Sequence, residues 1–317
     1  MEVIQAFVAQ GAQMALVLLL APLLTGVVRK LKARLTRRRG ASVIQPYRDL
    51  LRLLRKDVVL AENASWLFRV VPYLVFAAIW VAASLVPTFA AGLIFSGSAD
   101  LIALIALLGS ARFFLALAGM DVGTSFGGIG SSREMMIASL AEPAMIMVVF
   151  TLALVAGSTQ LSYIAGLFAS SGVGLRVSLG LALIALVMVA IAENSRIPVD
   201  NPATHLELTM VHEAMVLEYS GRHLALIELA ASLKLLLYMS LIACLFAPWG
   251  LARGGGLAAD LIGLASWLVK LGIGGALLAF FETSIAKMRV FRVPEFLGAA
   301  LMLGFLASLL LFVSKGF

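Results

Sequence analysis

The chain has 317 residues, of which 62% are hydrophobic and 13% are charged. A mean hydropathy of +1.04 excludes an ordinary soluble domain and is typical of a protein embedded in lipid. The formal net charge of +7 would suggest nucleic-acid binding in a soluble protein. In a membrane protein basic residues first mark the cytoplasmic loops, so we expect no nucleic-acid partner.

Eight apolar runs are long enough to cross a bilayer, which needs about 20 residues. They predict an all-α integral membrane protein, folded as a single polytopic domain over residues 1–317. The runs cover residues 3–28, 70–95, 101–120, 135–156, 175–193, 224–246, 257–282 and 296–313. The first run lacks a basic start and is too long for a signal-peptide core, so we expect it to remain as a helix.

Lysine and arginine are distributed unevenly over the predicted loops. The loops after the first, third, fifth and seventh runs carry 12, one, two and three of the 24, which makes 18. The other side carries Arg176, Arg253 and Lys315. The positive-inside tendency then predicts that residues 29–69 and 194–223 are cytoplasmic and that both termini face outward.

The basic loop 29–69 contains a predicted amphipathic helix. Its apolar residues are Leu50, Leu51, Leu53 and Leu54, and its basic residues are Arg48, Arg52, Arg55 and Lys56. Two interpretations stay open. The helix could lie in the headgroup plane and do nothing more. Alternatively, it is a docking surface for a cytoplasmic partner, with Arg48 and Asp49 as a fixed polar pair.

A glycine-rich segment follows the third run, with glycines at 119, 123, 127, 128 and 130. It predicts a tight cytoplasmic loop closed by Arg133 and Glu134, because glycine permits sharp turns and close packing. No strand precedes it and no Gly-Lys-Ser follows, so we do not expect nucleotide binding. Arg112 lies about two turns inside the third run, which is deep for a surface charge.

Six of the ionisable residues within apolar runs stand out: Glu142, Glu193, Glu228, Lys234, Lys270 and Glu282. Such groups are costly in a membrane and usually mark ion paths, so they predict a polar axis through the bundle. Glu142 precedes Pro143, and two interpretations apply to it. Its carboxyl group could hydrogen-bond a carbonyl that the proline frees, or it could exchange protons with a pKa raised by burial.

Residues 192–221 form a polar island between two apolar runs. Five of the 17 acidic residues fall in it, Glu193, Asp200, Glu207, Glu213 and Glu218, together with His205 and His212. A helix is predicted from Asn201-Pro202 to Gly221, with Glu207 and Glu218 on one face and Glu213 on another. The His212-Glu213 pair lacks the second histidine of a zinc motif. The island is therefore a candidate ion path.

Cys244 is the one cysteine and lies inside an apolar run. One thiolate can hold neither an iron–sulfur cluster nor a structural zinc ion. We therefore expect no cofactor or metal in this chain, and any redox centre in a partner.

Several of these motifs resemble the subunit 1 family of respiratory complex I, its heel subunit. The shared patterns are A-E-x-x-R-x-P-x-D at 192–200, E-Y-S-G at 218–221, and an arginine at 133 paired with a glutamate at 142. The resemblance is closer to the membrane subunits of group 4 nickel–iron hydrogenases and formate hydrogenlyase. Their R-R-G-x-x-x-x-Q-x-Y-R-D pattern appears at 38–49, and two further patterns appear at 112–126 and 130–134.

This resemblance implies a non-catalytic anchor in a bacterial inner membrane. It would join cytoplasmic hydrogenase-like large, small and iron–sulfur subunits, which carry the iron–sulfur clusters and any nickel–iron centre, to antiporter-like membrane subunits. By matching position, the start of a proton or sodium path would be lined by Glu142, Glu193, Asp200, Glu207 and Glu218. The contacts with the cytoplasmic arm would come from Arg48, Asp49, Asp121, Arg133 and Arg196.

Two departures from complex I bear on the function. The segment 39–44 is shorter than the G-P-N-R-x-G-P-x-G stretch of its quinone chamber, which argues against quinone chemistry. The segment 282–289 is close to the form found in hydrogenase relatives. The alternatives are a quinone-binding subunit 1 of an NADH dehydrogenase, a stand-alone ion transporter, for which inverted repeats are not evident, and a purely structural anchor.

Overall fold

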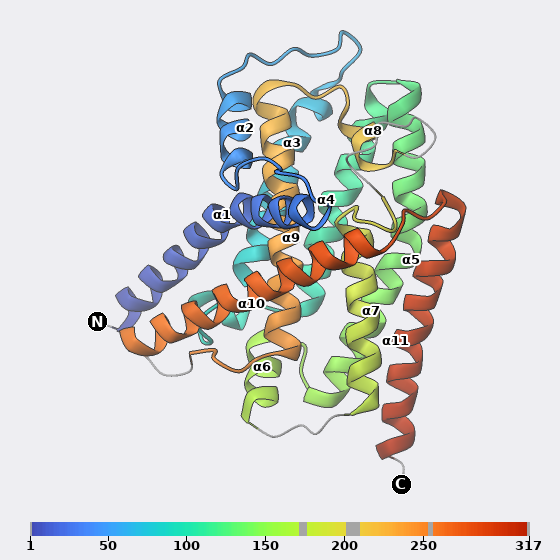
Figure 1. The fold of residues 1–317 in the computed structure, drawn as a ribbon. Coiled ribbons are helices and arrows are strands. Elements are labelled where there is room, and N and C mark those ends of the chain that lie inside the picture. The colour runs from blue at the N-terminus through green and yellow to red at the C-terminus, as the bar shows by residue number, and fades with distance from the viewer. Residues whose placement is uncertain (1, 171–175, 201–209, 253–255, 316–317) are drawn as a thin grey trace.

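The computed structural model describes residues 2–170, 176–200, 210–252 and 256–315 (Figure 1). Over these residues the chain is helical apart from connections and two isolated β-bridges. The helices are α1 (Glu2–Leu35), α2 (Gln45–Leu54), α3 (Trp66–Leu85), η1 (Ile94–Gly97), α4 (Leu101–Asp121), α5 (Ser125–Ala156), α6 (Leu161–Ser170), α7 (Val177–Glu193), α8 (His212–Val216), α9 (Gly221–Phe246), α10 (Leu257–Ser284), η2 (Val290–Arg292) and α11 (Val293–Lys315).

Seven of the described helices are long and apolar enough to cross a membrane, namely α1, α3, α4, α5, α9, α10 and α11. They correspond to seven of the eight predicted runs. The predicted fifth run, 175–193, corresponds to α7, an apolar helix of 17 residues that is shorter than the seven others. The prediction of an all-α integral membrane protein is confirmed, while the count of eight spans is not.

The helices α5, α7, α9 and α11 stand side by side, and α1 and α10 cross the bundle obliquely (Figure 1). α11 packs against α5 and α7, α3 packs against α4 and α9, and α1 packs against α9 and α10. Large side chains that are fully buried, such as Phe68, Leu104, Leu233 and Leu237, fill the interfaces around α3, α4 and α9. α4, α5, α7 and α9 thereby meet around one interior region.

The helix α3 ends ten residues earlier than predicted. It begins at Trp66, where the Ser65 hydroxyl accepts a hydrogen bond from the Leu67 N–H (3.1 Å), and Pro87 stands two residues beyond its last residue. Two buried glutamines of α1 satisfy carbonyls at this end, because the Nε2 atoms of Gln10 and Gln13 donate to Ser84 O (3.3 and 3.2 Å). The apolar residues after position 85 therefore lie in an irregular segment and in η1.

The glycine-rich segment predicted as a tight loop is divided between two helices: Gly119 lies in α4, Gly127, Gly128 and Gly130 lie in α5, and Gly123, with a left-handed φ of +71°, lies in the connection. The tight turn is therefore confined to residues 122–124, and the prediction that Arg133 and Glu134 close a loop is wrong because both lie within α5. α5 begins at Ser125, and residues 122–124 suffice to connect it to α4. A Cβ atom built on Gly127 would lie 2.0 Å from the Gly119 carbonyl oxygen of α4. Glycine is needed here because it lets the two helix ends approach closely.

The predicted continuous helix from Asn201 to Gly221 is wrong in its described part: residues 201–209 lie outside the described residues, and over 210–220 the chain is helical only at His212–Val216. α8 is the described helix in this stretch. Gly221 does not end a helix but begins α9, with a left-handed φ of +53°. A side chain there would also meet the backbone of Asp57, since a Cβ atom would lie 2.6 Å from its carbonyl oxygen.

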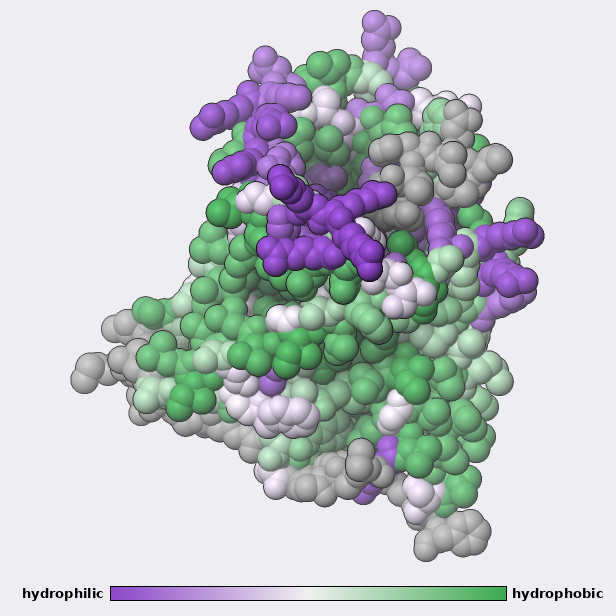
Figure 2. Space-filling model, viewed as in Figure 1, coloured by the Kyte–Doolittle hydropathy of each residue, from purple (hydrophilic) through white to green (hydrophobic). Residues whose placement is uncertain are grey.

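Hydrophilic residues gather at the end of the molecule that carries α2, and hydrophobic residues cover most of the remaining visible surface (Figure 2). α2 is present as predicted, and it packs against α1 and α9. Its exposed residues include both apolar and basic side chains, among them Leu51, Leu54, Arg48 and Arg52. Its position in the headgroup plane stays a prediction.

We predict that Gly127→Ala destabilises the protein by about 1–3 kcal/mol, since the added methyl group would overlap the α4 backbone. Gly128→Ala is the matched control, because a Cβ atom there meets nothing within 4 Å. That control should leave stability unchanged or raise it slightly. Thermal unfolding of both variants in detergent is the measurement, and equal melting temperatures would contradict the proposed helix contact.

Candidate functional site

A group of buried charges lies where α4, α5, α7 and α9 meet. The guanidinium of Arg112, whose side chain is 2% exposed, has its Nε atom 3.1 Å from Glu134 Oε1 and its Nη1 atom 3.8 Å from Glu142 Oε1. Its Nη2 atom contacts Glu193 Oε1. The second oxygen of Glu193, Oε2, lies 2.8 Å from Lys234 Nζ. We call these five residues the central cluster.

The positions of these residues along their helices explain how they come together. Glu134 and Glu142 are eight residues apart on α5, which is about two turns, so they lie on one face of it. Gly109 precedes Arg112 by nearly one turn of α4, and a Cβ atom there would lie 3.4 Å from Glu142 Oε1. Glu193 is the last residue of α7. The cluster is therefore assembled from four separate helices by their packing.

Burial is uneven across the central cluster. The side chains of Arg112, Glu134, Glu193 and Lys234 are 2%, 11%, 6% and 15% exposed. Glu142 is 43% exposed on this chain and is also the carboxylate farthest from the guanidinium. A buried charge is tolerated only when it is paired, so the pairing is a condition for this fold. Glu142 marks the outer end of the cluster.

A cavity of about 70 Å³ lies beside the central cluster. Its apolar wall comes from α3, α4 and α9 and includes Val75, Leu108 and Ile227. Its polar wall is formed by Arg112, Glu134, Glu193, Asn194, Ser195, His212 and Lys234. Such a volume has room for a few water molecules, and the polar wall supplies hydrogen-bonding partners for them.

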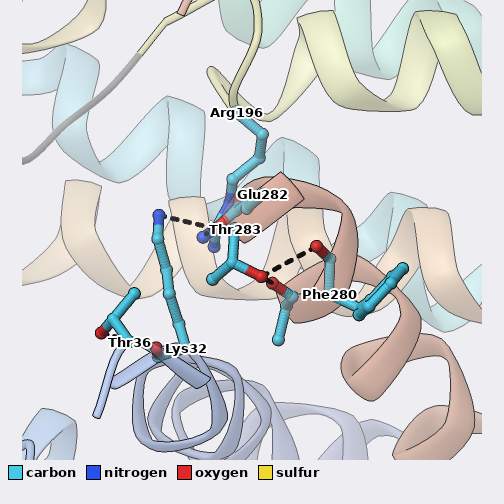
Figure 3. Close-up of polar contacts among 7 residues, drawn as sticks. Lys32, Thr36, Arg196, Phe280, Glu282 and Thr283 are labelled. Carbon is cyan, nitrogen blue, oxygen red and sulfur yellow. Dashed lines mark hydrogen bonds and ion pairs between the residues drawn. The ribbon is translucent and has the colours of Figure 1, made fainter. Parts of the chain in front are cut away.

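A second group of charges surrounds Glu282 of α10, a residue that is 4% exposed. Lys32 Nζ of α1 lies 3.0 Å from Glu282 Oε2, and Arg196 Nη1 lies 3.4 Å from Oε1. Figure 3 shows that Lys32 and Arg196 reach this carboxylate from different elements of the chain. We call these three residues the Glu282 cluster. It holds one acid between two bases.

The segment 194–200 connects the two clusters. Glu193 belongs to the central cluster, and Arg196, three residues later, belongs to the Glu282 cluster. Asp200 is 2% exposed and accepts from Lys287 Nζ at 3.0 Å. Its other oxygen accepts from the His212 backbone N–H at 3.4 Å. A displacement of the segment at one cluster would therefore be transmitted to the other.

The structure brings together several residues predicted for the ion path. Glu142, Glu193 and Lys234 join the central cluster, while Glu282 and Asp200 lie at or beside the Glu282 cluster.

The other predicted path residues lie elsewhere. Lys270 Nζ donates to the carbonyls of Ala247, at 2.6 Å, and Trp249, beyond the end of α9. Glu228 is half-buried, and within the described part of the chain its carboxylate joins neither cluster. Glu218 is exposed and Glu213 is half-buried, whereas Glu207 lies outside the described residues. Depth in an apolar run therefore does not by itself place Lys270 and Glu228 in a cluster.

Two of the five residues predicted to contact a partner hold the chain's own backbone. Asp121 Oδ2 accepts from the Ser65 N–H at 2.9 Å, and Arg133 Nη1 donates to the Met210 carbonyl at 2.8 Å. Arg196 is occupied by Glu282. Their contact with a cytoplasmic arm stays a prediction.

The predicted pair within α2 needs correction. Asp49 does not pair with Arg48, which is exposed; it accepts from Gln45 Nε2 at 2.8 Å and lies 3.8 Å from Arg52 Nη1. This follows from helix geometry, because residues three or four apart share a face and adjacent residues do not. In α5, Glu142 lies 3.8 Å from Arg112 Nη1, and Arg133 donates to the Met210 carbonyl.

Two members of the central cluster are missing from the sequence-based prediction of the site. Arg112 stands out in the sequence only for its depth in the apolar run, and Glu134 falls in the segment predicted as a loop. Once α5 is known to begin at Ser125, the spacing of Glu134 and Glu142 places both on the face that meets Arg112.

The sequence is similar to known proteins over nearly its whole length. The profile of the NADH dehydrogenase family matches residues 9–313. Formate hydrogenlyase subunit 4 of Escherichia coli (strain K12) is 35% identical over 290 residues, which are 90% of this chain and 92% of that protein. Hydrogenase-4 component C of the same strain is 36% identical over 278 residues, 88% of this chain and 87% of that protein.

Two further similarities are more distant. A subunit of the NADH-quinone oxidoreductase of Paraburkholderia xenovorans (strain LB400) is 28% identical over 225 residues, 66% of this chain and 63% of that protein. A chain of the membrane-bound sulfane sulfur reductase, an archaeal respiratory membrane complex, superposes with a TM-score of 0.80. It covers 97% of this chain and 99% of that one at 20% identity, which shows the same fold.

We predict that Arg112→Met costs about 3–5 kcal/mol of stability, because it leaves Glu134 and Glu193 buried with Lys234 as the remaining nearby base. Lys32→Met is the control. Lys32 is 34% exposed and Arg196 still faces Glu282, so its loss should cost about 1 kcal/mol or less. Thermal unfolding in detergent would compare the two, and equal shifts would show that the central cluster does not stabilise the bundle.

Proposed function

Because the chain belongs to the NADH dehydrogenase family, together with formate hydrogenlyase subunit 4 and hydrogenase-4 component C, we propose that it is the membrane-anchor subunit of a hydrogenase-type oxidoreductase complex. In this role it couples electron transfer in a cytoplasmic arm to the movement of protons or sodium ions. The similarity over about nine tenths of both Escherichia coli relatives supports a hydrogenase-type complex. The weaker similarity to the Paraburkholderia NADH-quinone oxidoreductase supports the alternative of a quinone-binding subunit.

The observation that carries this proposal is the central cluster. Two bases and three acids from four helices meet in a largely apolar bundle, and all but Glu142 are buried or nearly so. Charged groups are costly in such surroundings and most often belong to ion paths. A purely structural anchor could be held by apolar packing, so the cluster favours a role in ion movement.

The geometry indicates how a charge change would pass through the cluster. Glu193 is shared between Arg112 and Lys234, so its carboxylate neutralises part of each base. Protonation of Glu193 would weaken both ion pairs and leave Lys234 free to reorient toward the adjacent cavity. Protonation of Glu193 would also change the charge next to segment 194–200. Because Arg196 of this segment pairs with Glu282, the change would reach the Glu282 cluster.

Redox chemistry is assigned to the partners in this proposal. The hydrogenase-like arm would supply electron transfer through iron–sulfur clusters and any nickel–iron centre. The residues of this chain do not fit such a centre, because Cys244 is its one cysteine and is buried in α9. The cavity beside the cluster, at about 70 Å³, is also far smaller than the roughly 300–1,000 Å³ of a small-molecule site. This favours the hydrogenase-type complex over quinone binding.

The surfaces of the chain fit two kinds of partner. The end that carries α2 exposes basic and apolar side chains together, and we assign it to the cytoplasmic arm (Figure 2). α10 and α11 expose many large apolar residues along their length, which suits lipid or antiporter-like membrane subunits. The inner membrane of a bacterium and outward-facing termini complete the proposed arrangement.

We predict that Glu193→Gln in the intact complex lowers the number of ions moved per electron pair at least tenfold, while electron transfer in the arm continues. The substitution keeps the side-chain shape but removes the charge that Arg112 and Lys234 share. Glu62→Gln, at an exposed acid, is the control and should behave like the parent. Inverted membrane vesicles with a pH-sensitive dye or labelled sodium give the ratio, and an unchanged ratio would remove Glu193 from the path.

A stand-alone transporter is the competing class of function. Liposomes that contain only this chain should show no ion flux above empty liposomes under an imposed gradient, because the proposed path is driven by its partners. A flux from the purified chain alone would favour the transporter.

A further inference from the structure

One further assignment rests on the proposed function: we infer that His212 carries protons between water at the α8 end of the bundle and Glu193. The inference concerns where a proton reaches the central cluster. In the sequence His212 is part of the polar island that is predicted as a candidate ion path. The structure places it in the wall of the cavity beside the cluster.

The position of His212 is set by both its backbone and its neighbours. It begins α8, which packs against α4 and α5. Its backbone N–H donates to Asp200 Oδ2 at 3.4 Å, so the turn before α8 is tied to segment 194–200. The residue is half-buried, and it lines the same cavity of about 70 Å³ as Glu193 and Lys234. A few water molecules suffice to bridge that cavity.

The chemistry of the cavity wall singles out His212. Arg112, Glu134, Glu193 and Lys234 are held in ion pairs with one another. Histidine is the side chain that gains and loses a proton most readily near neutral pH, which suits it to pass protons on.

The two other histidines do not share this position. His223 packs edge-on against the rings of Tyr73 and Tyr219, with ring centroids 5.7 and 6.5 Å away, and does not line the cavity. His205 lies outside the described residues.

The proposed transfer moves one proton and no electrons. The neutral imidazole of His212 takes a proton from a hydronium ion at the α8 end, whose O–H bond breaks to leave water, and becomes imidazolium. An N–H bond of the imidazolium then breaks, and its proton passes through water in the cavity to a carboxylate oxygen of Glu193, where an O–H bond forms. His212 returns to the neutral form, and Glu193 becomes the uncharged acid that loosens its ion pairs with Arg112 and Lys234.

The test uses the intact complex in inverted membrane vesicles, with proton uptake and electron transfer measured together. His212→Gln should lower the protons moved per electron pair at least tenfold while electron transfer continues. His212→Ala should show the same loss, and added imidazole should restore much of the ratio, because a free imidazole can enter the space of the missing side chain. A merely structural role would not respond to imidazole.

His223→Phe is the matched control, because phenylalanine keeps a ring beside Tyr73 and Tyr219 and the residue does not line the cavity. The His223→Phe variant should move as many protons per electron pair as the parent, both with and without imidazole. His212→Gln could move as many protons per electron pair as the parent while Glu193→Gln remains impaired. That result would overturn the role of His212 and leave the proposed function standing. A loss in His212→Ala that imidazole does not restore would also overturn it. Parent vesicles that move no ions would overturn both proposals.

Discussion

The pairing of the Arg112 guanidinium with buried carboxylates is the interaction on which the rest of this structure depends. α4 places a permanent positive charge deep in an apolar bundle, and such a charge persists only with partners close by. The partners come from α5 and α7, and Lys234 of α9 then offsets the resulting excess of acid. The cluster therefore fixes the relative positions of four helices.

The segment 194–200 extends this constraint to the obliquely crossing helices. Arg196 joins Lys32 of α1 at Glu282 of α10, and Asp200 joins Lys287 beyond the end of α10. The Met288 N–H also donates to the Pro198 carbonyl at 2.9 Å. α1 and α10 are thus attached to the same short segment that follows Glu193. Segment 194–200 therefore links Glu193 in the central cluster to the crossing helices α1 and α10.

The sequence predicts the helical membrane class and most spans, because long apolar runs have few alternatives in lipid. It fails where local composition is ambiguous. The glycines predicted to form a loop instead permit close contact between α4 and α5, and this error hides Glu134. The depth of Glu228 in its run predicts a polar path, but depth does not reveal which face of a helix meets other charges. That information arises only from the packing of separate helices.

The charge balance of the central cluster limits how many protons it can hold. Three acids and two bases leave one negative charge in excess, and Glu142, which is 43% exposed and 3.8 Å from Arg112, is the acid best placed to carry it. One added proton brings the cluster to neutrality. A second proton would leave a base unpaired among apolar residues, which is costly. In the proposed ion path the cluster would therefore pass protons one at a time, with the exposed Glu142 at one end and the cavity beside Glu193 at the other.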